Sequence, residues 1–264
     1  MGTRSGRIAL VTGASGGIGK AIAECFARDG HDLVISARNT DALAAIAADW
    51  AKKYGVRVTP IGADLAQPGG AQRLCDDIAA AGIAIDFLVN NAGYGLFGEF
   101  KDLRLEDELA MMTLNMTSLT VLTKRFLPDV LARRGRIMNV ASTAAFQPGP
   151  YMAVYYATKA YVLSFSEALA SELAGTGVTV TAFCPGPTQS GFQDKAAMQD
   201  SGLMKGKRLP TAERVGAEGH AAMMAGRRVF IPGLVNKAMA ASVRMSPRKV
   251  VTAVVKAMSA PRPH

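Results

Sequence analysis

Short apolar runs alternate with amphipathic stretches along most of this chain. Apolar runs of about 4–8 residues are typical of strands buried on both faces, and apolar residues spaced three and four apart are typical of helices. Because helical stretches separate the apolar runs, we expect one parallel α/β sheet with right-handed crossovers. The strands are predicted at 8–11, 32–36, 56–61, 85–89, 135–141, 178–183 and 228–231.

The helical pattern occupies most of the intervening sequence, with a kink or boundary expected at Pro128. Residues 188–210 mix glycine, methionine and charge without clear periodicity, which is typical either of a substrate flap or of a plain surface excursion. No composition shift marks a linker, so residues 1–264 are expected to form a single domain with a C-terminal helical tail at about 234–258. The other helices are predicted at about 20–29, 41–54, 68–81, 105–134, 151–173 and 211–226.

Composition narrows the possible classes of protein. No apolar run reaches about 18 uncharged residues, so no membrane span is expected. The start of the chain lacks the apolar region of a signal peptide, which favours the cytoplasm. Cys25, Cys75 and Cys184 are odd in number and widely spaced, and the histidines lack metal-ligand spacing. We therefore expect neither a disulfide framework nor a metal site, and we interpret the cysteines as small buried hydrophobes.

The formal net charge of the chain is +9. Its basic residues are dispersed and match no nucleic-acid-binding motif, so an anionic cofactor or substrate explains the charge better than a nucleic acid. The densest basic cluster, Arg133–Arg136, follows a predicted helix, whose carboxyl end favours cations. The same cluster could instead contact an acidic partner such as an acyl carrier, and the sequence leaves both possibilities open.

A glycine-rich turn, TGASGGIG at residues 12–19, joins the first predicted strand to the first predicted helix. The first turn of a helix presents free N–H groups and the positive end of its dipole, which suit a pyrophosphate. We expect Gly13 to allow the tight turn, Gly17 to let the backbone approach the ligand, and Gly19 to let the helix pack closely. A plain glycine-rich turn is the alternative. The candidate cofactor-binding residues here are Gly13, Ser15, Gly16, Gly17, Ile18 and Gly19.

A second group of polar residues follows the fifth predicted strand. Tyr155 and Lys159 are four residues apart on a predicted helix, so they share one face. A free phenol has a pKa of about 10, and a neighbouring ammonium would lower it toward neutrality. Tyr155 could then act as a general acid or base, and Ser142, at the end of the strand, could donate a hydrogen bond to a carbonyl oxygen. A tyrosine and a lysine at this spacing also occur often by chance.

The ordered set is far more specific than any of its parts. The glycine turn, Asn90-Asn91-Ala92-Gly93, Ser142, the run YYATK at 155–159, and Pro185-Gly186-Pro187-Thr188 together resemble the short-chain dehydrogenase/reductase family. The resemblance implies a seven-stranded, doubly wound Rossmann sheet with helices on both faces, as a three-layer α/β/α sandwich. It also implies hydride transfer between a nicotinamide and an alcohol or carbonyl.

Within that resemblance, each matching position carries an expected role. Tyr155 matches the catalytic tyrosine, Lys159 the lysine that also holds the nicotinamide ribose, and Ser142 the substrate-orienting serine. Asn115 matches the asparagine that supports a proton relay through water. Tyr156 lacks the spacing to Lys159 and is assigned to packing or to the pocket rim.

The resemblance extends to the rest of the cofactor site. It implies that Asp64, with Leu65, meets the adenine, although Asp64 could equally cap a turn or helix. Further contacts are expected from the wall beside the adenosine ribose and from the turn beside the carboxamide, where Thr188 is the polar residue. These residues are Asn91, Ala92, Gly93, Pro185, Gly186 and Thr188.

The end of the second predicted strand bears on which nicotinamide cofactor is used. An acidic residue there would accept the ribose 2′-OH and repel a 2′-phosphate. This chain has Ala37 and then Arg38, whose planar guanidinium suits a phosphate. We predict a preference for NADP(H) over NAD(H), with a solvated Arg38 at the start of a helix as the alternative.

Apolar and aromatic residues near the expected pocket favour a lipophilic carbonyl substrate, such as a 3-oxoacyl chain, a steroid-like ketone or an aromatic aldehyde. The same residues could simply pack the fold. They are Tyr94, Leu96, Phe146, Tyr151 and Phe192.

Three further points stay open at this stage. A non-catalytic NADP(H)-binding regulator or scaffold is the alternative function, although the proton-transfer residues are all present. Family members pair through the helices that carry Asn115 and Tyr155, which implies a homodimer or homotetramer. The basic tail could cap the pocket, seal an interface or touch a membrane surface.

Overall fold

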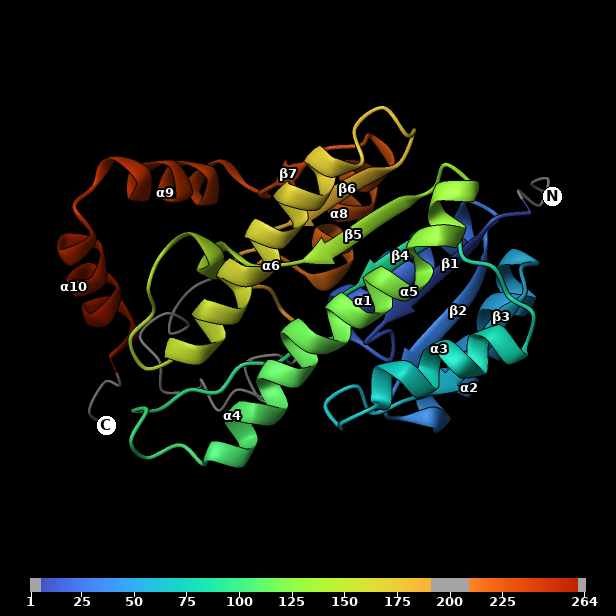
Figure 1. Ribbon diagram of the computed structural model, residues 1–264, viewed down its shortest axis with the longest axis horizontal. Helices are drawn as coiled ribbons and strands as arrows, with labels where there is room; N and C mark the ends of the chain where they lie inside the picture. The colour runs from blue at the N-terminus through green and yellow to red at the C-terminus, as the bar shows by residue number, and fades with distance from the viewer. Residues whose placement is uncertain (1–5, 191–208, 261–264) are drawn as a thin grey trace.

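The computed structural model describes residues 6–190 and 209–260 of the chain, and Figure 1 shows its arrangement. Within those residues, seven parallel strands form one sheet in the order β3-β2-β1-β4-β5-β6-β7. The sequence-based fold class is therefore confirmed. The strands are β1 (Ile8–Thr12), β2 (Asp32–Ala37), β3 (Val58–Gly62), β4 (Phe87–Asn90), β5 (Arg136–Val140), β6 (Thr179–Phe183) and β7 (Val229–Phe230).

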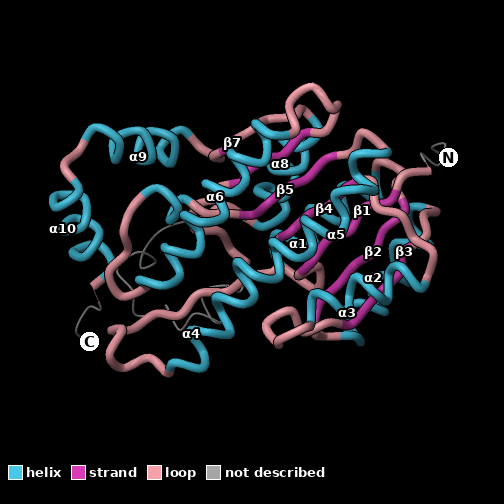
Figure 2. The backbone as a smooth tube through the Cα atoms, in the orientation of Figure 1, coloured by secondary structure: helices cyan, strands magenta, loops and turns pink. Residues whose placement is uncertain are grey.

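Helices connect successive strands and cover both faces of the sheet (Figure 2). Most of them begin and end within three residues of the sequence-based bounds. They are α1 (Gly17–Arg28), α2 (Thr40–Tyr54), α3 (Gly70–Ala80), α4 (Leu105–Met112), α5 (Leu119–Ala132), α6 (Ala153–Glu172), α8 (Ala212–Met224), α9 (Leu234–Met245) and α10 (Arg248–Ser259), with a π-helix η1 (Thr113–Ser118) and a 3₁₀-helix η2 (Thr143–Phe146).

The sheet is buried on both faces because successive strand residues point in opposite directions. In β1, Ala9 and Val11 pack with apolar residues of α1, α2 and α8, whereas Leu10 packs with α3, α5 and α6. Each face has its own apolar core, and Phe26 and Trp50 are among the largest fully buried side chains. This packing fixes the ends of the strands relative to the ends of the helices, which is where the site lies.

The break expected at Pro128 is not observed. Pro128 lies inside α5, which continues to Ala132, and the irregular backbone occurs instead at η1, between α4 and α5. A π-helical turn widens the helix locally, and such turns are frequent at functional sites. It carries Asn115, one of the predicted catalytic residues.

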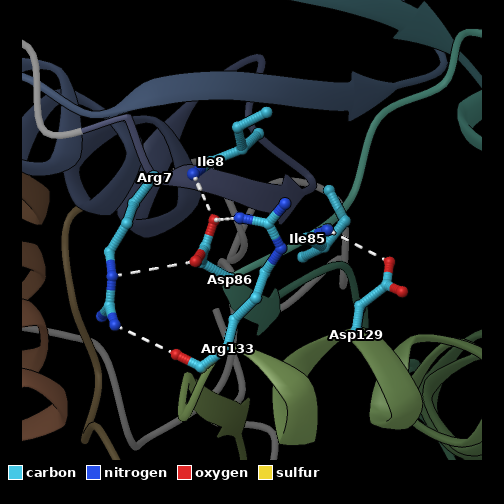
Figure 3. Close-up of polar contacts among 6 residues, drawn as sticks. All are labelled: Arg7, Ile8, Ile85, Asp86, Asp129 and Arg133. Atoms are coloured by element: carbon cyan, nitrogen blue, oxygen red, sulfur yellow. Dashed lines mark hydrogen bonds and ion pairs between the residues drawn. The ribbon is translucent and has the colours of Figure 1, made fainter.

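Charged side chains at the amino end of the sheet satisfy backbone groups that the strands leave free (Figure 3). The buried Asp86 accepts from the Ile8 amide at 2.9 Å and lies within 4 Å of Arg7 and Arg133. Arg7 also donates to the Arg133 carbonyl, and Asp129 accepts from the Ile85 amide at 3.2 Å. These contacts join β1, α5 and the start of β4.

The Arg133–Arg136 cluster therefore has a structural role. Arg133 pairs with Asp86, and Arg136 donates to the Thr179 hydroxyl at 3.1 Å. Arg136 also begins β5, so the cluster lies at the end of the sheet opposite to the residues that follow each strand. An acyl carrier bound there would face away from Ser142, and the structural interpretation is the better one.

The C-terminal tail forms two helices, α9 and α10, which Figure 1 shows in red tones at the side of the molecule away from α2 and α3. Gly186, in the turn after β6, has so little space that a Cβ there would lie 2.7 Å from Asn236 of α9. Val251 and Val255 of α10 pack with Met111, Met152 and both tyrosines 155 and 156. Among the described helices, none is long and apolar enough to cross a membrane.

Candidate active site

A cavity of about 1710 Å³ opens at the carboxyl ends of the strands. Drug-sized ligand pockets measure roughly 300–1,000 Å³, so this cavity has room for a longer ligand such as a dinucleotide. It lies where open α/β sheets bind ligands. Every predicted cofactor-binding residue lines it, namely Gly13, Ser15, Gly16, Gly17, Ile18, Gly19, Arg38, Asp64, Leu65, Asn91, Ala92, Gly93, Tyr155, Lys159, Pro185, Gly186 and Thr188.

The glycine turn is shaped by its surroundings. Gly13 has φ +68°, and a Cβ there would lie 2.8 Å from the side-chain nitrogen (Nδ2) of Asn91. Gly19 packs against Asn91 and the Gly13 carbonyl so closely that any side chain would collide with them. Gly17 has φ +55° and lies against Ser190, whereas a Cβ at Gly16 would meet nothing within 4 Å. The close-packing role predicted for Gly19 is thus present, but the open position is Gly16 rather than Gly17.

Thr12 and Asn91 lock the glycine turn to the segment after β4. The Asn91 side chain donates to the Thr12 carbonyl at 2.8 Å and to that of Gly13 at 3.3 Å. In return, the Thr12 hydroxyl accepts from the amides of Asn91 and Ala92. Asn91 therefore shapes the cavity by holding two loops together, a role that reading each motif separately does not reveal.

Ser142, Tyr155 and Lys159 lie together on the cavity wall. Ser142 caps η2 by accepting from the Ala144 amide at 3.1 Å, and its hydroxyl is hydrogen-bonded to that of Tyr155. Lys159 donates to the Val140 carbonyl at 2.9 Å, and its Nζ lies 5.8 Å from the centre of the Tyr155 ring. Ser142 follows β5, and Tyr155 and Lys159 share one face of α6. The fold thus brings together three residues that span 17 positions of the sequence.

The protonation states differ from the sequence-based expectation. Burial raises the pKa of Tyr155 above its usual value, and only the hydrogen bond with Ser142 opposes this effect. Burial also lowers the pKa of Lys159 to about 8. The expected lowering of the Tyr155 pKa by Lys159 is absent, and the ammonium donates to the Val140 carbonyl instead. Cys184, which adjoins Lys159, has its pKa raised to about 12 by burial, as suits an inert thiol.

Asn115 lies behind the cavity wall rather than on it. Its amide donates to the Tyr94 carbonyl at 3.0 Å and to the Thr158 hydroxyl at 3.1 Å, and its oxygen accepts from the Tyr94 amide. A Cβ at Gly93 would lie 3.0 Å from this oxygen and 3.4 Å from the Lys159 Nζ. Asn115 therefore joins η1, α6 and the loop after β4, and Gly93 of that loop lies next to both Asn115 and Lys159.

Of the two residues expected at the adenosine end of the cofactor, the Arg38 side chain is exposed and the Asp64 side chain is held by a hydrogen bond. Arg38 is exposed at the end of β2, and Asn39 after it caps α2 by accepting from the Ala42 amide at 2.9 Å. Asp64 accepts from the Ala66 amide at 3.0 Å, so it does cap a turn while also lining the cavity. The turn-capping interpretation of Asp64 is therefore observed, and its contact with the adenine stays a prediction.

The predicted substrate-pocket residues are only partly brought together. Tyr94 lines the cavity, whereas Leu96, Phe146 and Tyr151 lie outside its lining and pack in apolar clusters or against Phe97. Phe192 lies outside the described residues. Apolar lining comes instead from other elements, including the tail, and includes Leu114, Ala144, Met152, Val235, Met239 and Met258.

Comparison with known proteins agrees with this geometry. The family model described as short chain dehydrogenase matches residues 7–201. This chain belongs to the short-chain dehydrogenase/reductase family. A short chain dehydrogenase of Pseudocercospora fijiensis is 32% identical over 193 residues, which cover 72% of this chain and 62% of that one. The chain thus spans less than two thirds of that relative's length.

Solved structures of short-chain dehydrogenases match over more of the chain. A short-chain dehydrogenase from Sphingobium yanoikuyae in complex with NADPH is 32% identical, with a TM-score of 0.82 and coverage of 92% and 94%. A bulky-bulky ketone specific alcohol dehydrogenase from Comamonas testosteroni is 27% identical, with a TM-score of 0.77 and coverage of 93% and 96%. The protein is accordingly an oxidoreductase of this family.

In this short-chain dehydrogenase/reductase, a buried polar network fixes α6 and was missed by sequence reasoning. Asn90 donates to Thr123 and to Asn139, each at 2.9 Å, and Asn139 donates to Ser166 at 2.9 Å. The network joins β4, β5, α5 and α6, the helix that carries Tyr155 and Lys159. Buried amides in strands were the available signal, since such groups require partners.

Proposed function

We propose that the protein is an NADP(H)-dependent oxidoreductase that transfers a hydride between the nicotinamide and a lipophilic ketone, aldehyde or alcohol. The observation that carries this proposal is the location of Ser142, Tyr155 and Lys159 on the wall of the same cavity as the glycine turn. The residues present fit the cofactor, because the helix N-terminus and the open face at Gly16 leave the backbone accessible.

The proposed roles follow from the contacts of each side chain. The bound nicotinamide supplies or accepts the hydride. The Tyr155 hydroxyl donates a proton to the substrate oxygen during reduction, and the Ser142 hydroxyl orients that oxygen beside it. Lys159 stabilises the deprotonated tyrosine once its ammonium is redirected from the Val140 carbonyl, and Asn115 holds the backbone of η1 and the loop after β4 in place.

The preference for NADP(H) is supported by Arg38, which is exposed on the cavity wall directly after β2. The Sphingobium relative was solved with NADPH. Catalytic efficiency measured with each cofactor tests the preference. We expect NADPH to exceed NADH by at least tenfold, since an arginine–phosphate contact contributes roughly 1.5–3 kcal/mol. An equal or higher efficiency with NADH would refute it.

A lipophilic substrate is supported by apolar side chains that line the cavity, among them Met152, directly before α6, Val235 of α9 and Met258 of α10. The Comamonas relative is named for bulky ketones. The test is a carbonyl panel, followed by loss of NADPH absorbance, that pairs hydrophobic ketones with small sugars and hydroxy acids. We expect turnover with the former, and turnover confined to the polar compounds would overturn the assignment.

We also propose a homodimer or homotetramer formed through the helices beside Asn115 and Tyr155. Leu105 and Leu109 of α4 are exposed, and Tyr161 of α6 is stacked on Phe165 at the surface. Light scattering gives the mass directly. Leu109→Glu should reduce it to that of the monomer, and a monomeric wild-type protein would contradict the proposal.

A further inference from the structure

Arg214 is a charged residue of the cavity wall with no role in the chemistry described so far. It lies in the first turn of α8, its side chain is 75% exposed, and its Nε donates to Glu218 at 3.0 Å. Both residues line the cavity. The other cations that line it, within the described residues, are Lys159 and Arg38. Lys159 lies beside Tyr155 and Arg38 lies at the end of β2, which leaves the position of Arg214 to be explained.

The fold brings Arg214 close to the glycine turn. Ser190 lies over Gly17, since its oxygen would be 3.0 Å from a Cβ there. Gln189, the residue before it, pairs with Thr211 and donates from its amide to the Pro210 carbonyl at 2.9 Å. Thr211 in turn caps α8 by accepting from the Arg214 amide at 3.3 Å. A short series of contacts therefore connects the start of α8 to Gly17.

The helices themselves are pressed together at the same end. A Cβ at Gly216 would lie 2.6 Å from that of Ala21, so the first turns of α8 adjoin those of α1. Two helix N-termini, each with the positive end of a dipole, thus adjoin one cavity wall. The first turn of α1 has no acidic residue, whereas the first turn of α8 has Glu213. The dipole of α8 disfavours a cation in its first turn, and Glu218 is the anion that pairs with Arg214 here. A phosphate bound at the glycine turn would give Arg214 a second anionic partner.

We propose that the Arg214 guanidinium binds the pyrophosphate of the dinucleotide, and that Glu218 holds it in position before the cofactor arrives. This inference rests on the proposed use of NADP(H) and adds to it a residue outside the glycine turn. The pyrophosphate is common to NADPH and NADH, whereas the 2′-phosphate assigned to Arg38 belongs to NADPH alone. The two arginines therefore have separable effects on cofactor affinity.

Equilibrium binding tests the assignment without turnover. The dissociation constants of NADPH and NADH are measured by nicotinamide fluorescence for the wild-type protein, Arg214→Ala and Arg38→Ala. We expect Arg214→Ala to weaken both cofactors by the same factor, roughly 10- to 100-fold for a lost charge-assisted contact. Arg38→Ala should weaken NADPH alone. A matched control is Arg28→Ala, which removes a similar i,i+4 pair with Glu24 near the opposite end of α1 and should change neither constant.

Two further measurements separate binding from a structural role. ADP-ribose contains the pyrophosphate but neither the nicotinamide nor the 2′-phosphate, so Arg214→Ala should weaken it, whereas adenosine 2′-monophosphate should bind unchanged. Glu218→Gln should weaken the binding of NADPH and NADH by a smaller factor than Arg214→Ala does, because it removes the carboxylate that holds Arg214 in position.

Three outcomes would overturn the inference. A lower melting temperature for Arg214→Ala with unchanged dissociation constants would make the residue a surface ion pair only. A changed ratio of NADPH to NADH affinity would assign it to the 2′-phosphate instead. If the folded wild-type protein bound neither dinucleotide, the proposed function itself would fail, and this assignment with it.

Discussion

At the amino end of the sheet, the carboxylate of Asp86 accepts from the Ile8 amide and lies between two arginines (Figure 3). At the carboxyl end, Lys159 is also buried and donates to the Val140 carbonyl; no acidic residue of the described chain forms a salt bridge with it. At the amino end the buried charge has partners of opposite charge, whereas the carboxyl end has a buried cation without an acidic partner and a large cavity. The difference agrees with a stabilising role for the amino end and with the proposed binding of an anionic ligand at the carboxyl end.

The largest expected effect comes from removing the Tyr155 hydroxyl at the carboxyl end. Tyr155→Phe should lower kcat by about 100- to 10,000-fold, because it deletes the proposed proton donor. NADPH affinity, measured by fluorescence titration, should change by less than about threefold. The matched control is Tyr54→Phe, which loses a hydroxyl bonded to Glu24 away from the cavity and should keep its turnover. Undiminished turnover in Tyr155→Phe would favour a non-catalytic protein.

Removing Asp86 should affect stability and leave activity unchanged. Breaking a buried ion pair costs about 3–5 kcal/mol, but Arg7 and Arg133 are 39% and 43% exposed, so we expect about 2 kcal/mol for Asp86→Ala. Urea unfolding measures this loss. Asp76→Ala, which removes an exposed pair with Arg125, should cost less than about 1 kcal/mol. If Asp86→Ala lowered NADPH affinity while remaining fully folded, the functional distinction between the two ends would be wrong.

The buried Lys159 predicts a pH dependence of stability. Its pKa is lowered to about 8 in the folded protein from 10.5, so between those values the unfolded chain holds a proton that the folded chain has released. The free energy of unfolding should therefore rise by about 1–2 kcal/mol between pH 7.5 and 9.5. Urea unfolding of the cofactor-free protein and of Lys159→Met isolates this contribution. An equal slope in both proteins would contradict it.

The smallest expected effect distinguishes two glycines of the same turn. Gly16→Ala should leave the free energy of unfolding within about 0.5 kcal/mol, because its backbone is extended and no atom lies within 4 Å of the new methyl group. The substitution should weaken NADPH binding by about tenfold, because the methyl group narrows the approach to the N-terminus of α1. Gly13→Ala should instead destabilise the protein by more than about 1 kcal/mol, since φ is +68°. Unchanged NADPH affinity in Gly16→Ala would place the pyrophosphate elsewhere.

The sequence was informative wherever a local pattern determines structure. Alternating apolar runs predicted the strands, and the spacing of four between Tyr155 and Lys159 placed both on one face of α6. All of the residues expected at the cofactor line one cavity, because the ends of parallel strands meet at one edge. Their functional roles stay predictions until variants are measured.

The misjudged features depend on tertiary contacts. Pro128 is accommodated within α5, and the helix widens at η1 instead, where Asn115 bonds to Tyr94 and Thr158. Burial raises the Tyr155 pKa, and the degree of burial depends on the whole fold rather than on the spacing to Lys159. Val235 and Met258 reach the cavity from the tail, for which capping the pocket was one of three possibilities that the sequence left open.

The position of that tail bears on how the specificity of such an enzyme could diverge. The family model ends at residue 201, yet part of the apolar wall comes from Val235, Met239 and Met258. The proposed proton-transfer residues and part of the proposed substrate wall are thus encoded in separate portions of the gene. Replacing the last thirty or so codons could redirect the enzyme to a different carbonyl compound while its reaction chemistry is inherited intact.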